Sequence, residues 1–79
     1  MPAYKDDLMT VGELARRVGV TVRTIQYYDA RGVVSPSELS EGGRRLYSQE
    51  NLERLRIACF LRELGLSLND ISSLFQEEG

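Results

Sequence analysis

Residues 21–31 carry the side chains with the most specific chemistry in this chain. The segment reads Thr-Val-Arg-Thr-Ile-Gln-Tyr-Tyr-Asp-Ala-Arg and has the spacing of a short amphipathic helix. One arc of that helix presents Arg23, Thr24 and Tyr27: a guanidinium fork, a hydroxyl beside a methyl group, and an aromatic ring with a polar tip. Such groups contact base edges, thymine methyls and phosphates, so this arc could read the groove of a nucleic acid.

The other positions of this helix are expected to serve packing and anchoring. At about 100° per residue, Gln26 and Asp29 fall on the apolar arc that should face the protein. Tyr28 lies at the border, where it could be a DNA contact or a core residue. Thr21 precedes the first turn, and the backbone amides of residues 21–23 with the positive helix end offer a site for a phosphate oxygen.

A second basic cluster lies in the run Gly-Gly-Arg-Arg-Leu-Tyr at residues 42–47. We interpret residues 33–47 as a loose two-stranded hairpin, because the glycine pair suits a turn with positive φ and the residues after it alternate as in a strand. Alternation would let the leucine anchor the hairpin while Arg45 and Tyr47 face outward. With Arg44, they could reach a minor groove or its flanking phosphates.

Each of these two features has an ordinary explanation when it is taken alone. An amphipathic helix with arginine and tyrosine can be a packed helix with a solvated face. A Gly-Gly-Arg-Arg run can be a polar turn. The prediction of a DNA-binding surface therefore depends on both features occurring in one small chain.

The helix at 21–31 is expected to belong to a helix-turn-helix unit over residues 8–31. Thr10 and Glu13 have capping-box spacing and begin a first helix, and Gly19 suits the left-handed conformation that ends it. Thr21 then caps the second helix after a very short turn. Two short helices joined so tightly must cross steeply.

Residues 48–77 are expected to form a supporting pair of helices. Ser48 caps the third helix, Gly65 ends it, and Ser67 with Asp70 forms a capping box for the fourth. The apolar positions at helical spacing are Leu52, Leu55, Ala58, Cys59, Leu61, Leu64, Leu68, Ile71, Leu74 and Phe75. The predicted fold is mainly α with a small β-hairpin, forming one domain.

Composition makes several function classes improbable. The chain of 79 residues has no histidine and one cysteine, Cys59, so we expect no enzyme activity, no metal site, no cofactor and no disulfide. Cys59 is expected to be a small buried hydrophobe. No apolar run approaches the roughly 20 residues of a membrane span, and the N-terminal residues lack the apolar core of a signal peptide, which favours the cytoplasm.

The net charge of −2 conceals a basic middle section. Residues 16–62 contain nine arginines and five acidic residues, whereas residues 63–79 contain four acidic residues and no basic one. An exposed surface of mixed charge would also fit these numbers. The use of arginine in place of lysine favours a nucleic-acid surface, because the guanidinium fork binds phosphate and guanine edges bidentately.

Three motifs in order resemble the DNA-binding domain of the MerR family of bacterial transcription regulators. They are the run from Thr10 to Asp29, the Gly-Gly-Arg-Arg-Leu-Tyr-Ser run, and Leu-Arg-Glu-Leu-Gly-Leu-Ser-Leu-Asn-Asp-Ile. The resemblance covers residues 9–76. It implies a winged helix-turn-helix of four helices and a two-stranded wing, with the second helix in the major groove. It also implies that Arg62 approaches a phosphate.

Two positions depart from the common family pattern, and the chain stops early. Many members have arginine at the position of Gln26 and tyrosine at that of Arg44. The resemblance also implies a long dimerisation helix and an effector domain, which this chain lacks, and a dimer that helps RNA polymerase engage a promoter. We therefore expect a fragment of a longer regulator or a minimal module, with a homodimer only when the missing helix is present.

We predict a sequence-specific module for double-stranded DNA that contributes one half-site of recognition to a transcription regulator. The expected contacts are Thr21, Arg23, Thr24, Tyr27, Tyr28, Arg44, Arg45, Tyr47 and Arg62. One alternative is an excisionase-like architectural protein that bends DNA. Another is a winged module whose exposed helix docks a protein partner.

Overall fold

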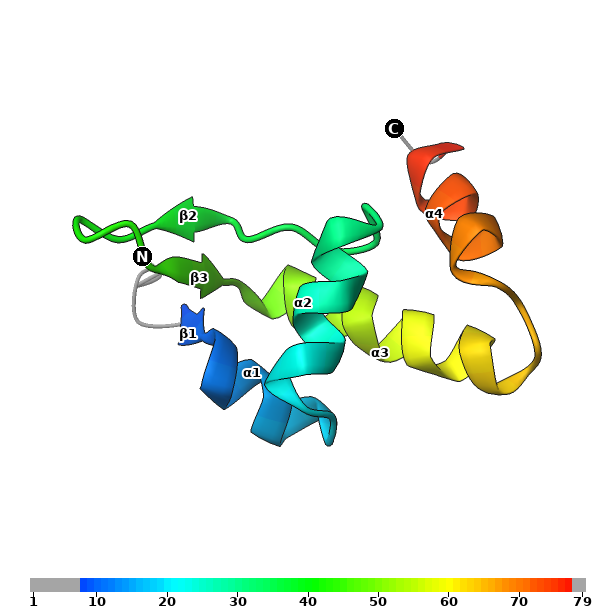
Figure 1. Cartoon of the computed structure of the whole chain (residues 1–79), viewed down its shortest axis with the longest axis horizontal. Coiled ribbons are helices and arrows are strands. Elements are labelled where there is room, and N and C mark those ends of the chain that lie inside the picture. Colours follow the sequence, from blue (N-terminus) through cyan, green and yellow to red (C-terminus); the bar gives the residue numbers. More distant parts are fainter. Residues whose placement is uncertain (1–7, 78–79) are drawn as a thin grey trace.

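The computed structural model describes residues 8–77 and confirms a mainly helical fold with a small antiparallel sheet (Figure 1). The elements in order are β1 (Met9–Thr10), α1 (Val11–Val18), α2 (Val22–Ala30), β2 (Glu38–Leu39), β3 (Arg45–Tyr47), α3 (Gln49–Glu63) and α4 (Leu68–Glu77). Within this range, no helix has the length and apolarity that a membrane span requires.

The first two helices form the predicted tight unit, and its local signals are confirmed. The Thr10 side chain accepts from the backbone N–H of Glu13 at 3.2 Å, while a Glu13 carboxylate oxygen accepts from the Thr10 N–H at 3.0 Å. Gly19 ends α1 with φ of 88°, a conformation that glycine adopts without steric cost. Thr21 caps α2, so only three residues separate the two helices.

The wing is part of a three-stranded sheet, one strand more than the sequence predicts. β3 lies between β1 and β2 and is antiparallel to both, with Met9 opposite Tyr47 and Leu39 opposite Arg45. The strand pairing of β1 fastens the start of the helix-turn-helix to the base of the wing. The segment between α2 and β2 is not a strand, and its Val33 is fully buried in the core.

The third helix lies behind α2 and packs against β3, and α4 packs against α3 at the edge of the molecule (Figure 1). Ser48 caps α3 in a reciprocal capping box with Asn51, and Gly65 follows the helix with φ of 104°. The predicted apolar stripe is confirmed at most positions, but Leu64 and Leu74 are 62% and 47% exposed. Leu64 lies beyond the end of α3, and α4 packs at the edge of the molecule, so only a narrow stripe of α4 is covered.

The core extends across every helix and the central strand. Its residues, all under 9% exposed, are Met9, Leu14, Ala15, Ile25, Tyr28, Val33, Val34, Tyr47, Leu52, Leu55, Ala58, Leu68, Ile71 and Phe75. Two of the tyrosines therefore belong to the core. Because α2 and the end of β3 share this core, the base of the wing is tied to the inner face of α2.

Candidate nucleic-acid interface

The outward arc of α2 carries the side chains that the sequence places there. Tyr27 is 51% exposed, Arg23 is exposed, and Thr24 is half-buried. Within residues 8–77, the Arg23 side chain has no hydrogen-bond or ion-pair partner. Its guanidinium can therefore turn toward a ligand without breaking an existing contact in that part of the chain.

The N-terminus of α2 is arranged by a pair of threonines. Thr21 Oγ1 accepts from the Thr24 N–H at 3.1 Å and lies 2.9 Å from Thr24 Oγ1. This pair fixes the Thr24 hydroxyl and leaves its methyl group to face elsewhere. α2 has no acidic residue in its first turn, in contrast to α1 with Glu13. The positive end of the α2 dipole is therefore not neutralised locally and favours an anion.

The C-terminal half of α2 holds Tyr27 in place through aromatic and cationic contacts. The Arg31 guanidinium carbon lies 5.4 Å from the centroid of the Tyr27 ring. The Tyr27 and Tyr28 ring centroids are 6.4 Å apart. These contacts restrict the exposed ring and place a cation beside it, which suits a phosphate approaching the end of the helix.

Two expectations about α2 need correction. Tyr28, expected at the border between the two arcs, is 7% exposed and belongs to the core. Gln26, expected to face the protein, is exposed. It lies about 100° around the helix from the buried Ile25, at the edge of the apolar arc, and no element packs closely enough to cover it.

The surroundings of Tyr28 show what this side chain does instead. Burial raises its pKa above the ordinary value of 10.0, the neighbouring Cys59 thiol adds to the rise, and the Arg62 guanidinium opposes it. Burial likewise raises the pKa of Cys59, with Tyr28 opposing and Glu63 adding to the rise. The Tyr28 hydroxyl and the Cys59 thiol are therefore protonated at neutral pH. Their contact links α2 to the C-terminal half of α3.

Arg62, which the family resemblance makes a phosphate contact, lies in this region. Its side chain is exposed, and Nη1 donates to the backbone oxygen of Leu66 at 3.3 Å, after the end of α3. A guanidinium has five N–H donors, so this bond leaves others available. Its contact with DNA stays a prediction.

The strand β3 of the wing does not face the way that the sequence predicts. Tyr47 is 1% exposed, so the prediction that it faces outward with Arg45 is wrong. Arg45 and Tyr47 do share a face of β3, but that face turns toward α2 and the core. Alternation shows which residues share a face and not which face is inward. Burial raises the pKa of Tyr47, with Asp29 adding to the rise and Arg45 opposing it.

Arg45 joins the wing to α2. Its Nη1 donates to Oδ2 of Asp29 at 2.7 Å, and the two side chains are 56% and 18% exposed. This is the one ion pair within residues 8–77. The sequence does not predict this pair, although it contains both a carboxylate on the inner edge of the helix and an arginine-rich hairpin. What the sequence could not supply was the distance between them.

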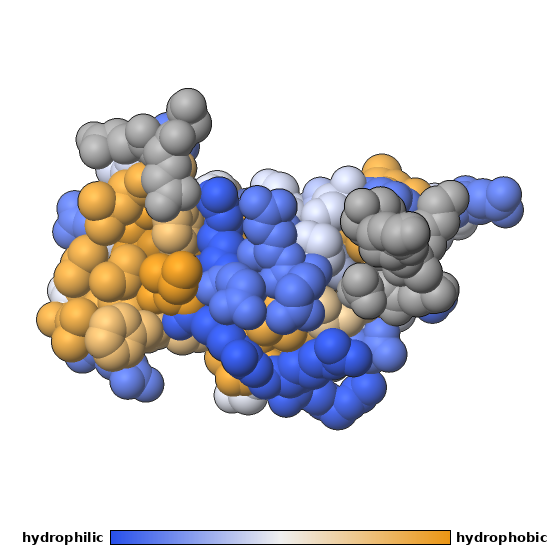
Figure 2. Space-filling model, turned by 180° about the vertical axis from the view of Figure 1, so that it is seen from behind, coloured by the Kyte–Doolittle hydropathy of each residue, from blue (hydrophilic) through white to orange (hydrophobic). Residues whose placement is uncertain are grey.

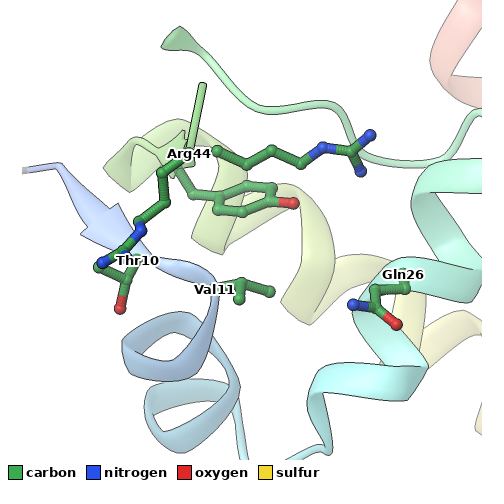
Figure 3. Close-up of a pocket in the computed structure, with 6 residues that line it drawn as sticks. Thr10, Val11, Gln26 and Arg44 are labelled. Atoms are coloured by element: carbon green, nitrogen blue, oxygen red, sulfur yellow. The ribbon is translucent and has the colours of Figure 1, made fainter. Parts of the chain in front are cut away.

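A cleft of about 360 Å³ opens between the wing and α2 (Figure 3). Its lining residues are Thr10, Val11, Gln26, Arg44, Arg45 and Tyr47. In Figure 3, Gln26 reaches in from α2 on one side, Thr10 and Arg44 lie on the other, and Val11 stands between them. Gln26 and Arg44 thus belong to one cleft.

Comparisons with known proteins agree with this geometry. Residues 9–78 match the family described as "MerR HTH family regulatory protein". A homologue of the HTH-type transcriptional regulator ZntR from Haemophilus influenzae is 41% identical over 70 residues, which are 89% of this chain and 52% of that protein. The chain thus spans about half the length of this relative.

Solved structures give the same result. The N-terminal part of the Bacillus subtilis multidrug transporter activator, MtaN, superposes with a TM-score of 0.81 and 37% identity, covering 85% of this chain and 63% of that one. HiNmlR, described as a MerR family regulator lacking the sensor domain and bound to promoter DNA, gives a TM-score of 0.78 and 27% identity. That match covers 85% of this chain and 53% of the other.

Proposed function

The chain belongs to the MerR family of helix-turn-helix regulatory proteins, and on this premise we propose that it reads one half-site of double-stranded operator DNA. α2 would enter the major groove, with the wing beside it on the backbone. The observation that carries this proposal is the outer face of α2, where Arg23 and Tyr27 are exposed next to a helix N-terminus without acidic neighbours.

Arg23 is assigned to base reading and Tyr27 to a thymine methyl or the sugar-phosphate backbone. A guanidinium binds the O6 and N7 atoms of guanine bidentately, and it can do so here because no group within residues 8–77 competes for it. Thr21 and Thr24 position the helix end against a phosphate. Tyr28 and Tyr47 are buried, and we assign both to packing beneath the contact surface.

The regulatory role follows from the family. Because this chain spans about half of its relative, we propose that dimerisation and effector binding belong to other segments of the complete regulator. The complete regulator would act on promoter DNA in the cytoplasm and affect the engagement of RNA polymerase. This chain would supply the DNA-reading part of that activity.

Selection from a random duplex pool, followed by titration at several salt concentrations, tests the proposal. We expect an enriched motif of a few base pairs and an affinity that falls steeply with salt, by a slope of about −0.9 for each phosphate neutralised. Absence of duplex binding at low salt would contradict the proposal and leave the protein-docking alternative. A salt-dependent affinity without an enriched motif, together with bending of the duplex, would instead favour the architectural alternative.

A further inference from the structure

The outward side of α3 carries an apolar stripe with the spacing of a helix-packing seam. Ile57, Phe60 and Leu64 follow one another at steps of three and four residues, which is the spacing of the contact positions in a coiled coil. Their side chains are 49%, 59% and 62% exposed, so no element within residues 8–77 covers this stripe. Apolar residues at this spacing on a surface helix serve packing, and here the packing partner is absent.

A groove runs beside this stripe, between α3 and α4. One hollow of about 160 Å³ is lined by Ile57 and Phe75 together with Glu50, Glu53 and Arg54. A second hollow, of about 210 Å³, shares Glu50 and Arg54 and continues toward the segment that follows α2. A cavity of about 150 Å³ is enough to hold benzene, so the first hollow can receive one apolar side chain of a partner.

Two glutamates give one end of the stripe an acidic character. Glu50 and Glu53 continue the three- and four-residue steps toward the start of α3. Both are exposed, and neither carboxylate is in an ion pair within residues 8–77. The outward side of α3 is therefore acidic near its N-terminus and apolar toward its C-terminus.

The arginines of α3 do not neutralise this acidic end. The Arg54 guanidinium carbon lies 4.6 Å from the centroid of the Phe75 ring, so this cation is held against the aromatic side of the groove. At 3.6 residues per turn, Arg56 lies about 80° and Arg62 about 160° around the helix from the centre of the stripe. The carboxylates are thus the charged groups within the stripe itself.

We propose that this groove receives an amphipathic helix of a partner protein that carries basic side chains beside its apolar seam. The seam packs on Ile57, Phe60 and Leu64, and one of its apolar side chains enters the hollow beside Phe75. Lysine or arginine side chains of the partner pair with the glutamates. A second copy of α3 does not fit as the occupant. It would set the glutamates against apolar residues when antiparallel, and against the same two glutamates when parallel.

Two synthetic helical peptides of about 20 residues test this surface. Both carry leucine at the seam positions, and the flanking positions are lysine in one peptide and glutamate in the other. We expect the lysine peptide to bind in the micromolar range and the glutamate peptide about tenfold more weakly or not at all. A variant with Glu50→Lys and Glu53→Lys together should reverse that order. Fluorescence anisotropy of labelled peptide measures each affinity.

Phe60→Ala tests the apolar part of the groove. It should weaken binding of the lysine peptide about tenfold, whereas the matched control Leu39→Ala, on β2 and 61% exposed, should bind like the unsubstituted chain. Because Phe60 is exposed, its truncation leaves the core intact. Phe60→Ala should bind duplex DNA as the unsubstituted chain does, so the test is independent of the proposed function.

Three outcomes would overturn the proposal. If neither peptide binds, or if both bind equally well, the face does not select a basic helix. If Phe60→Ala binds the lysine peptide as tightly as the unsubstituted chain does, the peptide lies elsewhere. Self-association of the unsubstituted chain that Phe60→Ala abolishes, measured by sedimentation without peptide, would assign the face to a second copy.

Discussion

Arg23 and Thr24 are adjacent in α2, but their polar groups differ in whether they already have a hydrogen-bond partner. The Thr24 hydroxyl is held by Thr21 at 2.9 Å, whereas the Arg23 guanidinium has no partner within residues 8–77. We therefore expect Arg23→Ala to change sequence preference, by ~1–3 kcal/mol at one base pair. Repeating the selection with the variant measures this. If Arg23→Ala loses the same affinity for selected and for scrambled duplexes, Arg23 contacts only phosphate.

The Asp29–Arg45 pair should contribute more to DNA binding than to stability. Because Arg45 is more than half exposed, solvent screening limits the pair to at most ~1 kcal/mol of unfolding free energy. Without it the wing can move relative to α2, so Asp29→Asn and Arg45→Ala should each weaken binding to all duplexes alike. Urea unfolding and duplex titration of both single variants and the double variant check this. A coupling energy in stability well above 1 kcal/mol would contradict it.

Tyr28, Tyr47 and Cys59 should make the fold sensitive to alkaline pH. Burial is the main cause of the raised pKa of each group, relative to ordinary values of 10.0 for tyrosine and 9.0 for cysteine. A group with a raised pKa in the folded state contributes fully below the unfolded value and loses that contribution as pH rises through the folded value. The free energy of unfolding should therefore fall above about pH 9.

Unfolding with urea between pH 7 and pH 11 measures this dependence. Tyr47→Phe removes one of the three titrating groups, so its stability should decline less steeply than that of the unsubstituted chain. A free energy of unfolding that stays constant or rises over this range would contradict the assignment.

At the scale of elements, β3 is the strand on which the sheet depends. It pairs with β1 and β2, and its Tyr47 is almost fully buried. Tyr47→Ala should lower the free energy of unfolding by ~3–5 kcal/mol, which is a large part of the stability of so small a domain. Tyr47→Phe keeps the ring, so it should lower the free energy of unfolding much less. Thermal unfolding followed by circular dichroism compares the two. Similar melting of the alanine variant and the unsubstituted chain would show that the wing does not share the core.

The elements that the sequence predicts correctly are those set by local signals. Thr10, Thr21 and Ser48 each cap a helix by accepting from the backbone N–H three residues later. The residues of one short segment are therefore enough to predict where each of these helices begins. β1 escaped prediction because its two residues form a strand only by pairing with β3, and the paired residues Met9 and Tyr47 are 38 positions apart in the sequence. The same non-local pairing decides which face of β3 turns inward.

The candidate site divides in a similar way. Arg23 and Tyr27 could be placed outward because helical periodicity carries that information within one element. The position of Gln26 depended on whether the wing would cover it, and the Asp29–Arg45 pair depended on how closely the wing approaches α2. Both are relations between elements, and the sequence alone does not contain those distances.

The whole molecule is elongated, with principal extents of 36 × 27 × 20 Å. The wing lies at one end and α4 at the other (Figure 1). Exposed apolar side chains occur toward the α4 end, where Ile57, Phe60, Leu64 and Leu74 are 47–62% exposed. Seen from behind, hydrophobic residues gather over α4 and the end of α3, away from the hydrophilic remainder of that face (Figure 2). The groups proposed to read DNA and this apolar region therefore lie on separate surfaces.

This separation predicts how the chain of 79 residues binds a palindrome. A stable protein interface usually buries about 800 Å² on each partner, a large share of the 5405 Å² accessible surface of this chain. Four partly exposed side chains do not provide that area, so the chain should sediment as a monomer at micromolar concentration. The two half-sites should then fill independently, without cooperativity.

Joining two copies through a flexible linker is the complementary experiment. It should raise affinity for a palindrome of suitable spacing by about 10²–10⁴ over a single half-site, because the second binding step becomes intramolecular. Centres of half-sites one helical turn apart are about 34–36 Å from each other, comparable to the 36 Å length of this chain, so two copies fit side by side. A stable dimer at micromolar concentration, or cooperative filling by the unlinked chain, would show that the α4 end already joins two copies.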